Sequence, residues 1–422
     1  MVVDRVANAD SAAGAAGAAR SAELATVPAN PRGKDVSGNS SAATPFASDE
    51  IASAHVAQAE RLVQAQVRLE GSACAVPQIG PMGNRRVTAL TSRTTSVAPP
   101  RGPTYSPKNF LLGTNLPWQN YGDDFGGLPS APHKGVSEPE QSAKLDKTLH
   151  DLSAQGVTTI RWFLLADGRA ITYDKHGTPT GIDLRVYTDI DAALGIAHKN
   201  GIKVIFSILD FHYLRAHPIA GKLPKHTPSA VLRSPAKMQA LIDNVYTPIL
   251  QRYAHNSNIA AWEVMNEPEW MTLGELGTNP WSAVSKRHMR AFLRAAVGAI
   301  HRYSNQQATV GSASVLTLGL VKGLGLDFYQ PHWYDHFQFL GPLETPVAEL
   351  HLDRPVVLGE FPTRRSFKST KTVLNIAQRA GYGGAMPWSV NATDSYSAYA
   401  KAAPAMTEWA KNHQADLYRP KP

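Results

Sequence analysis

Residues 108–422 predict an α/β fold with a parallel sheet, a (β/α)8 barrel of the TIM type, on three observations. Short runs rich in β-branched or aromatic residues alternate with longer segments of helical period, as βα units require. Gly156, Gly201 and Gly381 each end a helical segment close to a following run, as left-handed helix caps would. The strand-like runs number eight, at 109–114, 157–164, 202–209, 259–265, 308–312, 326–331, 355–359 and 383–388.

The intervening segments carry apolar stripes at helical spacing. Ser234 followed by Pro235 is an N-cap and first-turn signal for one of these helices. An open, doubly wound sheet is the alternative fold, but it usually has a Gly-rich phosphate turn after its first strand. Residues 115–118 (NLPW) are no such turn, which favours the barrel. The clearest stripe consists of Met289, Phe292, Leu293, Ala296, Val297 and Ile300.

The first 107 residues differ in composition and are expected to form a low-complexity, mostly disordered leader and a Pro-rich linker. Among Phe, Trp and Tyr residues, only Phe46 lies in the first 100 positions. Runs such as 11–20 (SAAGAAGAAR) contain too little apolar bulk to offset the entropy of ordering the chain. Segment 51–70 has the period of a helix, but an isolated helix of this length is expected to fray.

Composition and charge exclude several classes of protein. The single cysteine, Cys74, can form neither an internal disulfide nor a multi-cysteine zinc site. No stretch reaches the roughly 18 apolar residues of a membrane span, and no ordinary signal peptide is visible. The formal charge of +8 is accompanied by no motif or basic stripe that favours nucleic acid. We expect a monomer with no membrane span and no nucleic-acid partner.

Two carboxylates stand where a barrel places its chemistry, at the carboxyl ends of strands. The fourth run ends in 262–269 (WEVMNEPE) and the seventh in 357–362 (VLGEFP), so Glu267 and Glu360 could face one another across one mouth. Such a pair suits glycoside cleavage, in which one carboxyl protonates the leaving oxygen while the other attacks the anomeric carbon. Retention needs carboxyls about 5 to 5.5 Å apart and inversion a wider gap, and sequence spacing leaves both open.

The motifs resemble the retaining glycoside hydrolases of the large (β/α)8 clan. The cellulases and β-mannanases of glycoside hydrolase family 5 are the nearest type. The resemblance covers residues from about 109 to 410, because six matches fall in order on the expected strands. They are Arg161 in IRWF, His212 in LDFH, Asn266-Glu267-Pro268, His332 and Tyr334 in PHWYD, Glu360 in LGEF, and Trp388 in MPWSVN.

The resemblance implies that Glu267 is the acid/base and Glu360 the nucleophile. Arg161 and Tyr334 would hold Glu360 ionised and oriented. These roles are physically reasonable because the two carboxyls need opposite environments, one protonated near neutral pH and the other kept anionic by donors.

The other matched positions are implied to bind substrate. Asn266 would hydrogen-bond the sugar 2-hydroxyl, Trp388 would form the floor under the reacting sugar, and His212 and His332 complete the set. His332 and His336 stand four apart, but their neighbours do not complete a set of metal ligands. We expect neither a metal nor another cofactor.

Two further glutamates flank the acid/base candidate. Glu263 lies four residues earlier, so on a strand it faces the same side but deeper, and we expect it to be the buried partner of an interior Arg or His. Glu269 lies beyond the proline and is expected in the loop or at the cleft rim. No Gly-x-Ser-x-Gly motif appears, which disfavours a serine hydrolase.

Two basic segments are expected to rim the same mouth. Our hypothesis is that they attract an anionic polysaccharide, and a solvated basic rim without function is the alternative. Loop 213–233 contains Arg215, His217, Lys222, Lys225, His226 and Arg233 without an acidic residue, and Arg364, Arg365 and Lys368 follow Glu360.

The sequence therefore predicts a retaining glycosidase that hydrolyses a β-linkage in a poly- or oligosaccharide by double displacement. An exo-acting glycosidase of the same clan and a carbohydrate-binding barrel without turnover are the alternatives. A polymer substrate suggests an extracytoplasmic location, but the compartment is left open.

Overall fold

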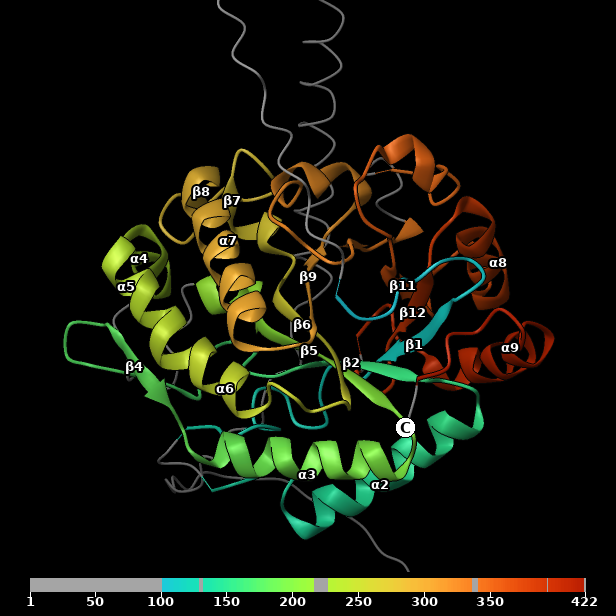
Figure 1. Ribbon diagram of the computed structural model, residues 1–422, viewed down its shortest axis with the longest axis horizontal. Coiled ribbons are helices and arrows are strands. Elements are labelled where there is room, and N and C mark those ends of the chain that lie inside the picture. The colour runs from blue at the N-terminus through green and yellow to red at the C-terminus, as the bar shows by residue number, and fades with distance from the viewer. Residues whose placement is uncertain (1–100, 129–131, 216–226, 336–340, 393, 421–422) are drawn as a thin grey trace, which may run out of the picture. The chain divides into compact units, whose positions relative to one another are not determined.

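The computed structural model describes residues 101–128, 132–215, 227–335, 341–392 and 394–420 (Figure 1). One sheet contains eight strands in the order β10-β9-β6-β5-β2-β1-β12-β11, and every paired neighbour is parallel. Each of the eight predicted runs overlaps one of these strands, so the predicted barrel is confirmed. The strands are β1 (Leu111–Asn115), β2 (Thr159–Phe163), β5 (Lys203–Asp210), β6 (Ile259–Asn266), β9 (Gln307–Ser312), β10 (Gln330–Pro331), β11 (Leu358–Pro362) and β12 (Gly384–Trp388).

The two ends of this sheet meet, so the barrel is nearly closed. The backbone N–H of Val357 donates to Tyr329 at 2.9 Å, and that of Trp333 donates to Glu360 at 2.9 Å. Strand β10 is shorter than the predicted run because hydrogen bonds from side chains take the place of some backbone hydrogen bonds between strands. The Asp327 carboxylate, for instance, accepts the Ala308 N–H at 2.8 Å.

Helices lie outside the strands, in groups visible in Figure 1. Every residue of the predicted stripe is buried on α7, and the Ser234 side chain accepts the Lys237 N–H at the start of α5, as predicted. One π-helical turn, Ile242–Tyr246, separates α5 from α6, and Pro248 follows it. Because proline lacks an N–H and crowds the carbonyl four residues earlier, a widened turn accommodates it. The helices are α2 (Pro139–Ala154), α3 (Arg185–Lys199), α4 (Thr227–Arg233), α5 (Pro235–Leu241), α6 (Thr247–Arg252), α7 (Lys286–Tyr303), α8 (Thr370–Ala380) and α9 (Tyr399–Asn412).

Two further sheets of two strands each lie outside the barrel sheet, and the sequence does not predict them. Strands β3 (Ile171–Tyr173) and β4 (Pro179–Ile182) form an antiparallel hairpin, and β7 (Thr272–Leu273) pairs with β8 (Val284–Ser285). Both lie in connections that leave the carboxyl ends of barrel strands, β2 and β6 respectively. They therefore belong to the end of the barrel where the predicted site lies.

The opposite end of the barrel interior is closed by apolar side chains, which we call the floor. Tyr105 belongs to it, 2% exposed, with its ring edge-on to Phe328 at 5.5 Å. The sequence assigns residues 101–107 to a linker, but they contact the barrel: Arg101 donates through its backbone N–H to Asp327 at 2.9 Å. The four prolines near Tyr105 favour a linker in the sequence, which does not reveal the cavity that the aromatic ring fills. The floor comprises Tyr105, Leu111, Ile205, Ala261, Phe328, Val357 and Met386.

The leader, including segment 51–70, lies outside the described residues up to position 100. The boundary between leader and catalytic domain therefore stays a prediction. Within the described ranges, no helix has the length and apolar character needed to cross a membrane.

Candidate active site

Arg161 is the centre of a buried polar network inside the barrel. It is the third residue of β2, and its side chain is fully buried. Its Nε and Nη2 donate to the two oxygens of Glu263, each at 2.6 Å, while Nη1 donates to Glu360 Oε1 at 2.7 Å. Ser207 Oγ donates to Glu263 at 2.7 Å, and Gln330 Nε2 donates to it as well. The prediction that Glu263 is the buried partner of an interior arginine is confirmed.

Glu360, on β11, is held by two donors. Besides Arg161, the Tyr334 hydroxyl donates to its Oε2 at 2.7 Å. Burial raises the pKa of Glu360, and the positive charge of Arg161 and the Tyr334 hydrogen bond act in the opposite direction. Gly359 allows the approach of the neighbouring strand, since a Cβ at this position would lie 3.0 Å from His332 Nε2. The carboxylate is thus fixed in one orientation by donors that favour its ionised form.

Glu267 follows the end of β6 in a left-handed conformation, with φ 44° and ψ 52°. This turn is anchored by its backbone N–H, which donates to the Gly311 carbonyl at 2.7 Å. Trp270 Nε1 donates to Glu267 Oε2 at 2.8 Å. Burial raises the pKa of Glu267 to about 7, and the negative charge of Asp210 adds to this effect. Glu267 can therefore carry a proton near neutral pH.

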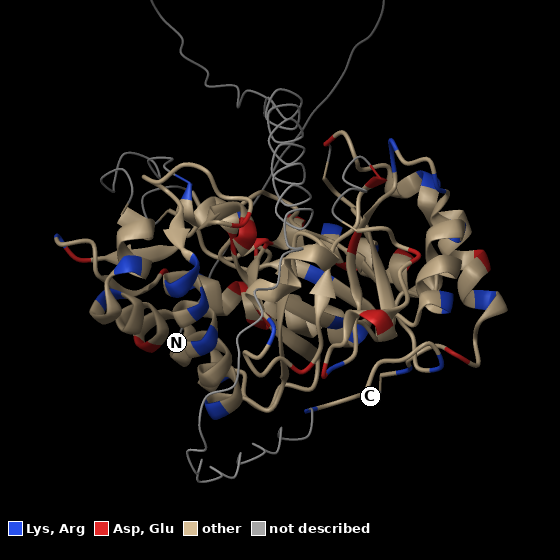
Figure 2. Cartoon of the chain, turned by 90° about the horizontal axis from the view of Figure 1, so that it is seen from above, with Lys and Arg blue, Asp and Glu red and all other residues tan. Residues whose placement is uncertain are grey.

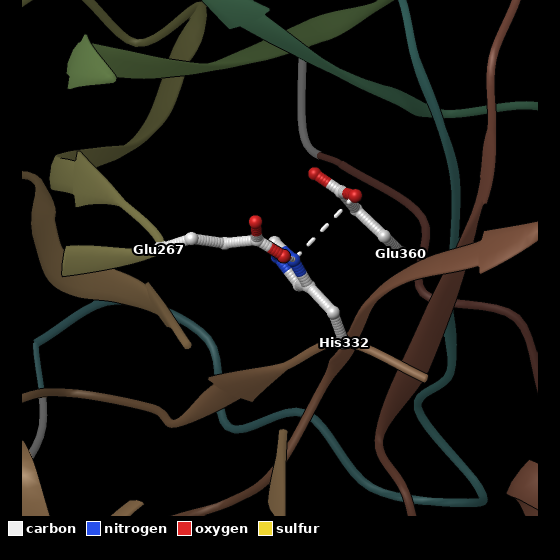
Figure 3. A group of neighbouring side chains, drawn as sticks. All are labelled: Glu267, His332 and Glu360. Atoms are coloured by element: carbon white, nitrogen blue, oxygen red, sulfur yellow. Dashed lines mark hydrogen bonds and ion pairs between the residues drawn. The ribbon is translucent and has the colours of Figure 1, made fainter. Parts of the chain in front are cut away.

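His332 lies between the two glutamates, as Figure 3 shows. Its Nδ1 is 2.8 Å from Glu267 Oε1 and 3.5 Å from Glu360 Oε2. Burial lowers the pKa of His332 to about 4, so the ring is neutral at working pH. One carboxylate oxygen of each glutamate lies within 4.8 Å of the other, which is closer to the carboxyl separation of retaining than of inverting enzymes.

The same three side chains are also the set among the described residues whose donor atoms are close enough to bind a metal ion. The sequence predicts no metal, and nothing in the structure tests that expectation. Each donor already has a role in the hydrogen-bonding described above.

Asn266, His212 and Asp210 form a second group at the mouth. Asn266 accepts from Arg161 Nη2 at 2.6 Å and donates through Nδ2 to Asp210 at 2.8 Å. His212 Nδ1 pairs with the other oxygen of Asp210, while its Nε2 lies 3.3 Å from Arg215 Nη1. The amide of Asn266 is thereby fixed, with a second N–H of Nδ2 left for a ligand.

A cleft of about 300 Å³ opens over both glutamates. Trp388, at the end of β12, lines it and donates through Nε1 to Asp394 at 2.7 Å. All the predicted substrate-binding residues except Arg161, which lies beneath, line this cleft. Its aromatic lining consists of Trp118, Tyr121, Phe163, Phe211, Trp270, Trp333, Tyr334, Trp388 and Tyr396.

Glu269 lies in the connection after β6, as predicted, but it is buried and does not lie at the cleft rim, which corrects the other part of the prediction. It stands in a short 3₁₀ helix, Pro268–Met271, and is 0% exposed. The tight turn after Pro268 directs its side chain inward toward the end of β9, where its Oε2 accepts the Ala313 N–H at 3.2 Å. The number of residues between Glu269 and the end of β6 does not indicate that the chain folds back toward β9.

Sequence reasoning also missed several residues that support the site. Asp210 could have been found, because a carboxylate at a strand end two residues before a candidate histidine is a common partner. Asn115 accepts from Arg161 at 3.0 Å and donates to the Gly359 carbonyl at 2.9 Å, and Asp394 holds Trp388. No local feature of the sequence indicates that Asn115 and Asp394 belong to the site.

Among the described basic residues of the two segments, Arg215 lies at the mouth, with its Nη1 3.3 Å from His212 Nε2, whereas Arg233 and Lys368 are engaged by other groups. Arg233 Nη2 is engaged by the backbone carbonyls of Pro280 and Ala283, at 2.8 and 2.7 Å. Lys368 pairs with Glu344 at 2.8 Å. Figure 2 shows Lys and Arg spread over the helices on both flanks of the strands. His217, Lys222, Lys225 and His226 lie outside the described residues, so the attraction of an anionic substrate stays a prediction.

Comparison with known proteins agrees with the geometry. The family model Cellulase (glycosyl hydrolase family 5) matches residues 121–312. A mannan endo-1,4-beta-mannosidase of Mytilus edulis is 26% identical over 325 residues, covering 66% of this chain and 83% of the relative. A protein of the same name from Cryptopygus antarcticus is 26% identical over 337 residues, covering 69% and 84%.

Solved structures give the same fold. An endo-1,4-beta-mannanase from Eisenia fetida superimposes with a TM-score of 0.61 at 24% identity, covering 74% of this chain and 95% of that one. The beta-mannanase of Mytilus edulis gives 0.60 at 26% identity, covering 72% and 92%. The chain is therefore a retaining glycoside hydrolase with a (β/α)8 barrel, which hydrolyses a β-glycosidic bond in a poly- or oligosaccharide by double displacement and is similar to the enzymes of glycoside hydrolase family 5.

Proposed function

We propose that this enzyme cleaves internal β-1,4 linkages of a mannan, with Glu267 as acid/base and Glu360 as nucleophile. The sugar is suggested by the two relatives, both named mannan endo-1,4-beta-mannosidase, which match along more than four-fifths of their own length. The residue roles rest on the geometry of the site.

The contrast between the two carboxyls carries the assignment. Glu267 has a pKa of about 7 and lies against a neutral histidine and an indole N–H. Glu360 receives the Arg161 guanidinium and the Tyr334 hydroxyl, each at 2.7 Å. A protonated acid and an anionic nucleophile, placed side by side, are what the first step of retention requires.

The reaction then proceeds in two displacements. The Glu360 carboxylate forms a bond to the anomeric carbon as the glycosidic C–O bond breaks, and Glu267 gives its proton to the leaving oxygen. In the second step, the ionised Glu267 takes a proton from water, whose oxygen attacks the same carbon and releases Glu360. Arg161 and Tyr334 stabilise the charge that returns to Glu360.

The remaining predicted residues are placed to bind the reacting sugar. Asn266 offers its free N–H of Nδ2 toward the cleft and is fixed from behind by Arg161 and Asp210. Trp388 is fixed by Asp394, so its ring is a rigid wall for a pyranose face. His212 is oriented by Asp210 through Nδ1, its Nε2 lies 3.3 Å from Arg215 Nη1, and its ring lines the cleft beside them.

Following the products formed from mannan tests the proposal. NMR of the first reducing ends should show the β-anomer, because two inversions restore the starting configuration. Chromatography should show a mixture of short oligosaccharides early, as internal cleavage produces. Release of mannose alone from chain ends would favour the exo-acting alternative, and binding without product would favour the barrel without turnover.

A comparison of neutral and acidic glycans across a salt series tests the anionic-substrate hypothesis. Attraction by the basic segments would make turnover of the acidic glycan fall as salt rises, while the neutral glycan is unaffected. Equal rates with no salt effect would remove that hypothesis and leave the mannan proposal intact.

A further inference from the structure

Glu269 is a buried carboxyl to which the mechanism above gives no task. It is 0% exposed, its Oε1 has no hydrogen-bond partner among the described residues, and its Oε2 accepts the Ala313 N–H at 3.2 Å. Burial raises its pKa to about 8, the charge of Glu267 adds to this, and no cation is among the main causes. Glu269 can therefore carry a proton near neutral pH.

This side chain closes a small structural unit around the acid/base. Glu267 donates its backbone N–H to the Gly311 carbonyl at 2.7 Å, near the end of β9. Two residues later, Glu269 accepts the N–H of Ala313, from the residue directly after β9. Both ends of the turn 267–269 are thus hydrogen-bonded to residues 311–313 at the end of β9, one end through its backbone and the other through a side chain.

The fastening matters because Glu267 has a backbone conformation that a non-glycine residue rarely adopts. A φ of 44° costs of order 1 kcal/mol and persists only where the surroundings impose it. If the outer fastening is lost, the turn can relax toward an extended backbone. The Glu267 carboxyl would then leave its position 2.8 Å from His332 and 2.8 Å from Trp270.

We propose that Glu269 is a positioning residue for acid catalysis: through its bond to Ala313 it holds the strained turn that aims Glu267 at the leaving oxygen. The carboxyl acts as a hydrogen-bond acceptor and needs no charge for this role. The inference rests on the proposed role of Glu267, and the test below separates the failure of one from the failure of the other.

The test compares substrates whose leaving groups differ in how much they need a proton from the acid/base when the glycosidic bond breaks. Glu269→Met keeps the volume but removes the acceptor, and Glu269→Gln keeps an acceptor oxygen without a charge. Each is compared on mannan, whose sugar leaving group needs protonation, and on dinitrophenyl β-mannobioside, whose leaving group does not. The quantity compared is kcat/KM, because it reports the first step.

For Glu269→Met we expect kcat/KM on mannan to fall by about 10²-fold, the low end of what general acid catalysis contributes, and to change little on the dinitrophenyl substrate. Glu269→Gln should restore the activity on mannan. Glu275→Ala is the matched control, since Glu275 lies in the same loop but pairs with Lys286 at 2.6 Å, away from the turn. It should leave both substrates unaffected.

Each other result overturns the proposal. An equal loss on both substrates means that Glu269 serves the fold in general, and a loss in Glu269→Gln as large as in Glu269→Met means that the acceptor role is wrong. Glu267→Ala is the reference: it must show the strongest dependence on the leaving group. If it does not, the acid/base assignment itself fails, whatever the Glu269 variants do.

Discussion

The two ends of the barrel interior are built from opposite chemistry. At the floor, the starts of the strands contribute apolar side chains, and Tyr105 closes the opening with its ring edge-on to Phe328 and Tyr418 at 5.5 and 5.4 Å. At the mouth, the same strands end in charged and amide side chains that accept hydrogen bonds from the guanidinium of Arg161. One barrel therefore contains a region whose chemistry stabilises the fold and a region whose chemistry performs the reaction.

The difference has an energetic reason. Burial of apolar area at the floor stabilises the fold directly, at about 25 cal/mol per Å². Buried charges at the mouth lose their hydration, and their mutual attraction only compensates for this loss when every group is paired. We therefore expect changes at the mouth to affect activity far more than stability, changes at the floor to do the reverse, and Arg161 to affect both.

Glu360→Gln should have the largest effect. Loss of the nucleophile should reduce kcat on every cleaved glycan by about 10⁴-fold or more. The amide keeps the shape of the side chain, so the melting temperature should change little. Activity assays and thermal unfolding of the same preparation test both statements, and survival of activity would show that another group attacks the sugar.

Arg161→Met tests the link between the two regions. It leaves the carboxylate of Glu263 buried without its main partner, which should cost about 3 to 5 kcal/mol of unfolding free energy. It also removes a donor from Glu360, so activity should fall too. Urea unfolding and kcat/KM give the two readouts.

Arg161→Lys is the matched control. Lysine keeps the charge but cannot make the paired bonds to Glu263 at 2.6 Å, so stability should recover only in part. Unchanged stability in Arg161→Met would mean that Glu263 does not depend on this guanidinium.

Tyr105→Ala tests the floor. The lost ring leaves a cavity, and we expect the unfolding free energy to fall by about 3 kcal/mol while kcat stays unchanged below the melting range. Tyr105→Phe is the control: the buried Tyr105 hydroxyl has no hydrogen-bond partner among the described residues, so its removal should be neutral or stabilising. A chain that begins at Lys108 lacks the whole segment and should be destabilised at least as much.

Patterns that repeat along the chain made the barrel predictable. Strand-like runs recur at every unit, and the three helix-ending glycines, Gly156, Gly201 and Gly381, do adopt positive φ. The hairpin β3–β4 is missed because its strands are only three and four residues long. Tyr105 is missed because a single ring has no periodicity, and only the assembled barrel contains the cavity that it fills.

The site was predictable where chemistry lies next to a strand end. The positions of Glu267 and Glu360 follow from the geometry of a barrel, and those of Arg161 and Tyr334 from the resemblance of their motifs to a known family. Glu269 was misplaced because its burial depends on a turn that folds back onto β9, which spacing in sequence does not encode.

Trp270→Phe should have the smallest effect, confined to the mouth. The indole N–H donates to Glu267 and lowers its pKa, so its loss should raise that pKa above about 7. The acid must be protonated to act, and activity is lost as pH rises through this pKa. The basic limb of kcat/KM against pH should therefore move to higher pH, while the acidic limb, set by ionisation of Glu360, stays in place. Trp118→Phe, which also alters the cleft lining, should move neither limb, and a basic limb that does not move in Trp270→Phe would mean that another group sets it.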